Sequence, residues 1–150
     1  MKNLLLLLAG VATIGFTGCD DDDDDSVDNM DPATRTEMIT STDWIMVSAV
    51  ETANGQTVDI FAAVPATAQD DVFNFSENGA VAREEGITRE VGSADVVDAG
   101  TWAFMNQEQA LKLDLKSLPV NDQIVELTNE RLVLRNFDGS RENITTFQAE

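Results

Sequence analysis

From residue 43 onward, the chain is a succession of short segments rich in β-branched and aromatic residues, most of them followed by a turn sequence. The clearest segment is Leu111 to Lys116, where leucines alternate with charged side chains. Because successive side chains of a strand point to opposite faces, this alternation predicts a strand between a core and water. Further segments of this kind lie at 44–50, 73–75, 81–83, 100–104, 124–127, 131–134 and 144–147.

Turn sequences join these segments into hairpins. Asn-Gly is favoured in two-residue hairpin turns because both positions need positive φ, so Asn78-Gly79 predicts a hairpin of 73–75 with 81–83. With the weaker stretches 58–62 and 96–97, the sequence predicts eight to ten strands at close spacing. Sequential hairpins favour an antiparallel up-and-down β-barrel, since closure removes exposed edges, and a β-sandwich is the alternative. A short helix is predicted before the strands, capped by Asp31, with Pro32 in its first turn and its end near Ile39.

The composition excludes most catalytic chemistry. The chain has no histidine and one cysteine, so it has no Ser–His–Asp or Cys–His nucleophile, no imidazole or thiolate metal site and no internal disulfide. Glu84 and Glu85 are adjacent and would point to opposite faces of a strand, whereas Asp95 and Asp98 are expected in a loop. We therefore expect no enzyme activity, cofactor or metal. With 28 acidic against nine basic residues, nucleic acid is not an expected partner.

The first residues have the pattern of an export signal. Lys2 precedes a run from Leu4 to Phe16 in which Thr13 is the only polar interruption. This run is too short for the roughly 20 apolar residues of a membrane-spanning helix and fits a secretory signal. Phe16-Thr17-Gly18-Cys19 resembles the lipobox of bacterial lipoprotein precursors. The resemblance implies that residues 1–18 are removed, that Cys19 receives lipid and that the protein is held at a membrane by that lipid.

A run of aspartates follows the cysteine: Asp20, Asp21, Asp22, Asp23, Asp24 and Asp25. If Asp20 is taken as the first position of a calcium loop, the sixth position is Asp25 and the twelfth is Asp31. A calcium loop needs Gly and Glu at these two positions, so we expect no metal site here. Like charges keep such a segment extended and solvated, and we interpret residues 19–31 as a tether. The run resembles the signal that exports some lipoproteins to the outer face of the outer membrane. The alternatives are retention at the inner membrane, as Asp after the cysteine implies in other bacteria, a location facing the periplasm, and a plain spacer.

Residues 32–150 are predicted to form the barrel domain, with a net charge of −12 from 20 acidic and eight basic side chains. Four sequence pieces within it resemble bacterial lipocalin-like lipoproteins: Trp44 in the first strand, the aromatic segment 73–79, the Gly-Thr-Trp of 100–102, and 124–134 with its late Leu-Thr and Leu pattern. The resemblance extends from Asp43 to Phe147. It implies a barrel that can carry a small apolar ligand.

Five aromatic residues are candidates for a ligand pocket or, alternatively, for the core: Trp44, Phe73, Phe75, Trp102 and Phe104. An eight-stranded barrel is wide enough either to be filled by side chains or to hold one small ligand. Two functions therefore stay open: a lipid-anchored module that binds a small apolar molecule or an envelope component, and a non-catalytic interaction module of a surface protein complex with a filled interior. A lined cavity of about 300 Å³ or more would favour the first.

Overall fold

The computed structural model describes residues 33–89 and 91–150, which belong to one compact unit, Pro32–Glu150. A short helix comes first and strands follow it. In chain order the elements are α1 (Arg35–Thr40), β1 (Trp44–Ala53), β2 (Gln56–Asp59), the 3₁₀ turns η1 (Phe61–Ala63) and η2 (Ala66–Ala68), β3 (Val72–Phe75), β4 (Ala80–Glu84), β5 (Val96–Met105), β6 (Ala110–Asp114), β7 (Pro119–Leu127), β8 (Arg131–Asp138) and β9 (Arg141–Ala149).

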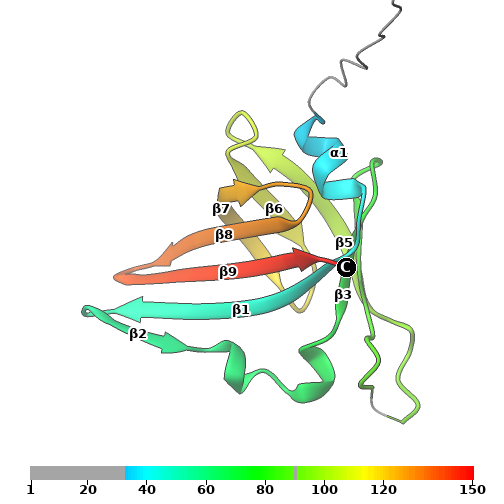
Figure 1. The fold of residues 1–150 in the computed structure, drawn as a ribbon, viewed down its shortest axis with the longest axis horizontal. Coiled ribbons are helices and arrows are strands. Elements are labelled where there is room, and N and C mark those ends of the chain that lie inside the picture. Colours follow the sequence, from blue (N-terminus) through cyan, green and yellow to red (C-terminus); the bar gives the residue numbers. More distant parts are fainter. Residues whose placement is uncertain (1–32, 90) are drawn as a thin grey trace, which may run out of the picture. The chain divides into compact units, whose positions relative to one another are not determined.

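The strands form a closed antiparallel barrel. Their order is β1-β3-β4-β5-β6-β7-β8-β9, and β9 pairs with β1, which closes the barrel (Figure 1). The extra strand β2 pairs with the C-terminal end of β1, at residues 50–53. Each barrel strand lies next to its neighbour in the chain, apart from β2 and the closing pair. The predicted up-and-down barrel with a short N-terminal helix is therefore confirmed. The alternative of a β-sandwich is wrong, because the sheet closes on itself.

The predicted alternation of buried and exposed side chains along residues 111–115, in β6 and the residue after it, is confirmed. Leu111, Leu113 and Leu115 are almost completely buried, whereas Lys112 and Asp114 are exposed. Across the barrel, Leu132, Leu134 and Phe147 are buried in the same way on β8 and β9. These inward side chains form one core, and burial of apolar surface at about 25 cal/mol per Å² is what holds the barrel together.

The helix begins three residues later than the sequence analysis expects. Thr34, not Asp31, caps α1: its hydroxyl accepts from the Glu37 N–H at 3.2 Å, and the Glu37 carboxylate accepts from the Thr34 N–H at 2.6 Å. This reciprocal pair is a capping box, which satisfies two of the backbone N–H groups that have no partner within the helix at its start. Asp31 and Pro32 lie outside the described residues.

The two Asn-Gly pairs make different turns. Asn54 and Gly55 both have positive φ and join β1 to β2 directly, as a two-residue turn requires. Between β3 and β4 only Gly79 has positive φ, and the turn spans four residues, closed by a hydrogen bond from Ser76 N to Ala80 O. The predicted hairpin of 73–75 with 81–83 exists, but its two-residue turn is wrong. Asn78 instead accepts from the Ala80 N–H through its side chain, which stabilises the longer turn.

The helix α1 closes one end of the barrel (Figure 1). Ile39 of α1 is completely buried in the core, and the indole N–H of Trp44 donates to its carbonyl oxygen at 2.9 Å. The guanidinium of Arg35 lies 5.8 Å from the centre of the Phe104 ring. The contacts of Ile39 and Arg35 attach a helix of six residues, which is too short to be stable alone, to the barrel.

Candidate functional site

The five aromatic residues that the sequence offers as pocket or core lie in the barrel core. Four of them are buried: Trp44, Phe73, Phe75 and Trp102. The fifth, Phe104, is partly buried and packs against the core cluster. Their rings meet edge to face: Trp102 contacts both Phe75 and Phe104, with ring centres 5.7 and 5.3 Å apart. Phe73 meets Phe147 in the same way at 5.4 Å. These residues therefore belong to the packed core, in which four of the five make ring contacts.

A small cavity lies inside the barrel. It has a volume of about 30 Å³ and is lined by side chains of five strands and of the β6–β7 turn: Met46, Leu113, Leu118, Val120, Asp122, Leu134, Thr145 and Phe147. About 30 Å³ is the share of a single water molecule in the liquid, whereas small-molecule sites measure about 300 Å³ or more. This part of the interior cannot take a lipid or another apolar ligand without rearrangement of the core.

One charged side chain borders this cavity. Asp122 of β7 is 4% exposed, and its carboxylate accepts a hydrogen bond from the Asn136 amide at 3.0 Å. The oxygen of Asn136 accepts in turn from the Asn143 amide at 3.1 Å. Burial raises the pKa of Asp122, and the bond from Asn136 only partly offsets this. These two hydrogen bonds connect β7, β8 and β9 through Asp122, Asn136 and Asn143. The arrangement requires the burial of a carboxylate, which is unfavourable for its charged form.

The raised pKa of Asp122 gives a testable pH dependence. A carboxyl whose pKa is higher in the folded state binds its proton more tightly there, so its contribution to stability falls as pH rises from the unfolded pKa through the folded pKa. Asp122→Asn keeps an acceptor for Asn136 and removes the charge. We expect the free energy of unfolding at pH 7 to rise by on the order of 1 kcal/mol. Urea unfolding at pH 4 and pH 7 measures the free energy of unfolding and its change with pH. Asp114→Asn on the exposed face of β6 is the control and should alter neither the free energy of unfolding nor its change with pH. A lower free energy of unfolding at pH 7 in Asp122→Asn would contradict this explanation.

A second buried carboxylate lies on the inner face near the start of β3. Asp71 is 3% exposed and forms an ion pair with Arg83 of β4 at 3.6 Å. Burial raises the pKa of Asp71, and the Arg83 guanidinium and the Gly86 amide oppose that shift. Burying a pair of charges costs desolvation energy that their attraction only partly returns, so the pair defines the packing of β3 against β4 more than it stabilises the barrel.

The acidic residues considered for catalysis do not converge. Glu84 lies at the end of β4 and is exposed, and Glu85 begins the β4–β5 loop. Asp95 lies in that loop as expected, but Asp98 lies in β5, so its predicted loop position is wrong: the weak stretch 96–97 and the segment 100–104 form one strand. Asp98 accepts from the backbone N–H and the hydroxyl of Ser117, both at 2.7 Å, and these bonds lower its pKa.

Within residues 33–89 and 91–150, no three Asp, Glu, Cys or His side chains are arranged to hold a metal ion. In the same part of the chain, no helix has the length and apolar character needed to span a membrane. Cys19 and the aspartates 20–25 lie outside the described residues. Comparison with models of known protein families finds no match, and none of the curated proteins searched matches the chain.

Sequence reasoning missed the role of Asp122, although its pattern was visible. Val120, Asp122 and Ile124 alternate along one strand, so a carboxylate lies at a position where its neighbours are apolar. The Asp71–Arg83 pair had no comparable signal, because it depends on the register of β3 with β4, in which Phe73 faces Arg83, and the predicted two-residue turn gives another register.

Proposed function

We propose that this chain is a lipid-anchored docking module of the bacterial outer membrane, in which the barrel acts through its outer surface and not as a carrier. The filled interior supports this proposal most directly. Aromatic rings of the core meet in three edge-to-face pairs, and the cavity beside Asp122 has a volume of about 30 Å³. A protein of this shape can still present its exterior to a partner, and the absence of histidine and the dispersed carboxylates give no support to a catalytic role.

The anchor in this proposal is the lipid on Cys19. The apolar run 4–16, followed by Phe16-Thr17-Gly18-Cys19, supports cleavage before the cysteine and its acylation. Two or more acyl chains hold a protein stably at a membrane, whereas one chain binds only marginally. The barrel topology is compatible with a lipocalin-like domain, so the proposal combines a lipocalin-like scaffold with a lipidated N-terminus.

The aspartate run 20–25 is the export signal in this proposal. Replacing all six aspartates with alanine should leave the protein lipidated but move it from the exterior of the cell to an inner-facing location. Protease accessibility on intact cells measures this, and we expect about a tenfold fall in the accessible fraction. Replacement by six glutamates is the matched control, because it keeps the charge. Unchanged accessibility in the alanine variant would reduce the run to a spacer.

Photo-crosslinking on intact cells tests the docking function. A benzoylphenylalanine placed at residue 87, 125 or 137 replaces an apolar side chain that is at least half exposed, so the barrel should tolerate it. We expect a discrete protein adduct from at least one position on irradiated cells. The same three positions in Cys19→Ser, which loses the membrane location, are the control and should lose that adduct. Failure of all three positions to yield a protein adduct on the anchored protein would overturn the docking proposal.

A further inference from the structure

The barrel wall is incomplete on one side of β1. On one edge β1 pairs with β9 along almost its whole length. On the other edge it pairs with β3 only at Trp44 and Ile45, and with β2 only at residues 50–53. Ala49 accepts a hydrogen bond from the Ile60 N–H at 2.9 Å, and residues 46–48 pair with no described strand on this second edge, where the chain continues as η1 and η2 (Figure 1). The divergence of β2 and β3 leaves room beside the middle of β1.

Two adjoining hollows occupy this room, and together we call them the β1 groove. The first has a volume of about 500 Å³ and is lined by Ile45, Met46, Val47, Phe61, Ala66, Gln69, Asp70 and Thr88. The second has a volume of about 320 Å³ and is lined by Ile45, Asp70, Val72, Glu85, Gly86, Ile87, Arg89 and Glu150. They share Ile45 and Asp70, so they form one surface depression between η1, η2 and the β4–β5 loop. Half of its lining residues are apolar, and the others are polar or charged, apart from Gly86.

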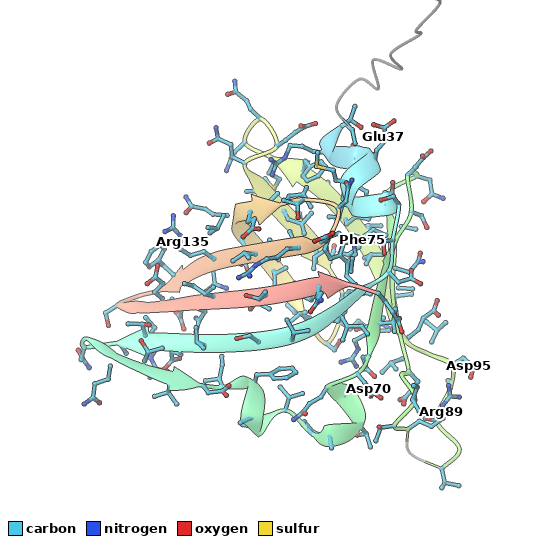
Figure 2. The ribbon with its side chains drawn as sticks, in the orientation of Figure 1. Glu37, Asp70, Phe75, Arg89, Asp95 and Arg135 are labelled. Atoms are coloured by element: carbon cyan, nitrogen blue, oxygen red, sulfur yellow. The ribbon has the colours of Figure 1, made fainter. Side chains whose placement is uncertain are left out.

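The charges that border the β1 groove are acidic. Asp70, Glu85 and Glu150 line it, and the guanidinium of Arg89 is paired with Asp95 at 2.9 Å (Figure 2). One oxygen of Asp70 and one of Glu85 are shielded from solvent and accept no hydrogen bond within the described residues. The lining of the β1 groove thus carries an excess of negative charge, which a cationic side chain of a partner would offset.

An exposed aliphatic side chain stands at the edge of the β1 groove. Ile87 is 96% exposed although the loop that carries it is attached at several points. Thr88 N–H donates to the Asp70 carboxylate at 2.7 Å, and Glu85 N–H donates to Asp95 O at 2.8 Å. At Gly86, which precedes Ile87, any Cβ would overlap the carbonyl oxygen of Asp70, so only glycine permits this close approach. The loop thus presents Ile87 to solvent beside an apolar depression.

We propose that the β1 groove binds an extended segment of a partner protein in which aliphatic side chains alternate with lysine or arginine. The aliphatic groups would cover Ile45, Val72 and Ile87, and an ammonium or guanidinium group would lie against the carboxylates that line the groove. The net charge of −12 on residues 32–150 favours a cationic segment over an anionic one. The inference rests on the proposed docking function and names the surface and the partner chemistry. An anionic membrane surface is disfavoured, because the carboxylates of the groove would repel it.

Fluorescence anisotropy with labelled heptapeptides tests this inference on the full-length lipidated protein in neutral detergent. The probe is Lys-Val-Lys-Ile-Lys-Val-Lys, and two further peptides replace its aliphatic residues with serine or its lysines with glutamate. We expect the probe to bind at least about tenfold more tightly than either, because it alone satisfies both the apolar side chains and the carboxylates. Equal binding of the serine peptide would reduce the interaction to general charge attraction and overturn the inference. Vesicles of neutral lipid, which do not attract the cationic probe, should not compete with it, and competition would favour a membrane surface instead.

Matched variants locate the binding. Ile87→Ser should weaken the probe about tenfold, whereas Val91→Ser, which alters an equally exposed residue of the same loop outside the groove lining, should leave it unchanged. Glu85→Gln should weaken it about fivefold, with the adjacent Glu84→Gln as control. Replacing residues 20–25 with serine should not alter the difference between Ile87→Ser and wild type. Equal binding by wild type and Ile87→Ser would overturn the groove assignment. If photo-crosslinks to a protein nevertheless form at residue 125 or 137, the docking function stands and only the groove is wrong.

Discussion

Replacing Cys19 with serine should release the protein from the membrane fraction. Under the proposed lipid anchoring, the precursor would then lack the thiol that receives the diacylglycerol group, and cleavage before residue 19 would not follow. We expect the variant as an uncleaved or soluble species, with the membrane-associated fraction of the processed protein reduced by about tenfold or more, since the lipid chains supply almost all of the membrane affinity. Fractionation of cells followed by intact-mass measurement of each fraction gives the result.

Gly10→Ala within the apolar run is the matched control, because it leaves the lipobox unchanged and should be processed and retained like the wild type. Membrane retention of a processed Cys19→Ser protein would contradict lipid anchoring. The barrel itself should fold in the variant, because its described core contains no cysteine.

Replacing Trp44 with alanine should destabilise the barrel by about 4 kcal/mol. The indole is completely buried, and its residue pairs with Phe73 on β3 and with Ala149 on β9, at the place where the barrel closes. Its N–H also donates to the carbonyl of Ile39 and thereby attaches α1. Since domains of this size are stable by roughly 5–15 kcal/mol, we expect the urea midpoint to fall markedly. We also expect the backbone amides of α1 to lose their protection from hydrogen exchange.

Trp44→Phe separates the two contributions, because it retains most of the ring volume and removes the hydrogen bond. It should cost roughly 1–3 kcal/mol, less than the alanine variant. Urea unfolding followed by far-ultraviolet circular dichroism measures both. A cost below about 1 kcal/mol for Trp44→Ala would mean that the ring does not carry the closure of the barrel.

The strands could be predicted because their side chains follow the sheet period. Leu111 to Leu115 alternate in the sequence and are buried alternately in the structure, and this requires no knowledge of the partner strands. Strand ends were harder: the weak stretch 96–97 and the segment 100–104 form one strand, because the pairing of β5 with β4 extends it beyond its own sequence signal. The helix cap was misplaced because Asp31-Pro32 is a strong local signal, while the Thr34 and Glu37 capping box is what the fold uses.

The candidate site was less predictable, because it depends on contacts between strands far apart in the chain. The five aromatic residues could be selected from composition and spacing, but their ring contacts come from the register of β3, β5 and β9. The β1 groove has no sequence signature, since it results from where β2 and β3 leave β1 and brings Glu150 beside Ile87. Physical reasoning on the sequence thus reached the type of fold, whereas the hollows on its surface required coordinates.

Native mass spectrometry of the protein extracted from the cell envelope in mild detergent tests most directly whether the barrel acts through its outer surface. The account predicts a mass equal to the lipidated polypeptide from residue 19, with no non-covalent small molecule, because the cavity beside Asp122 has room for about one water molecule. A small apolar molecule present at one copy per chain, and released when the protein is unfolded in acid, would contradict it.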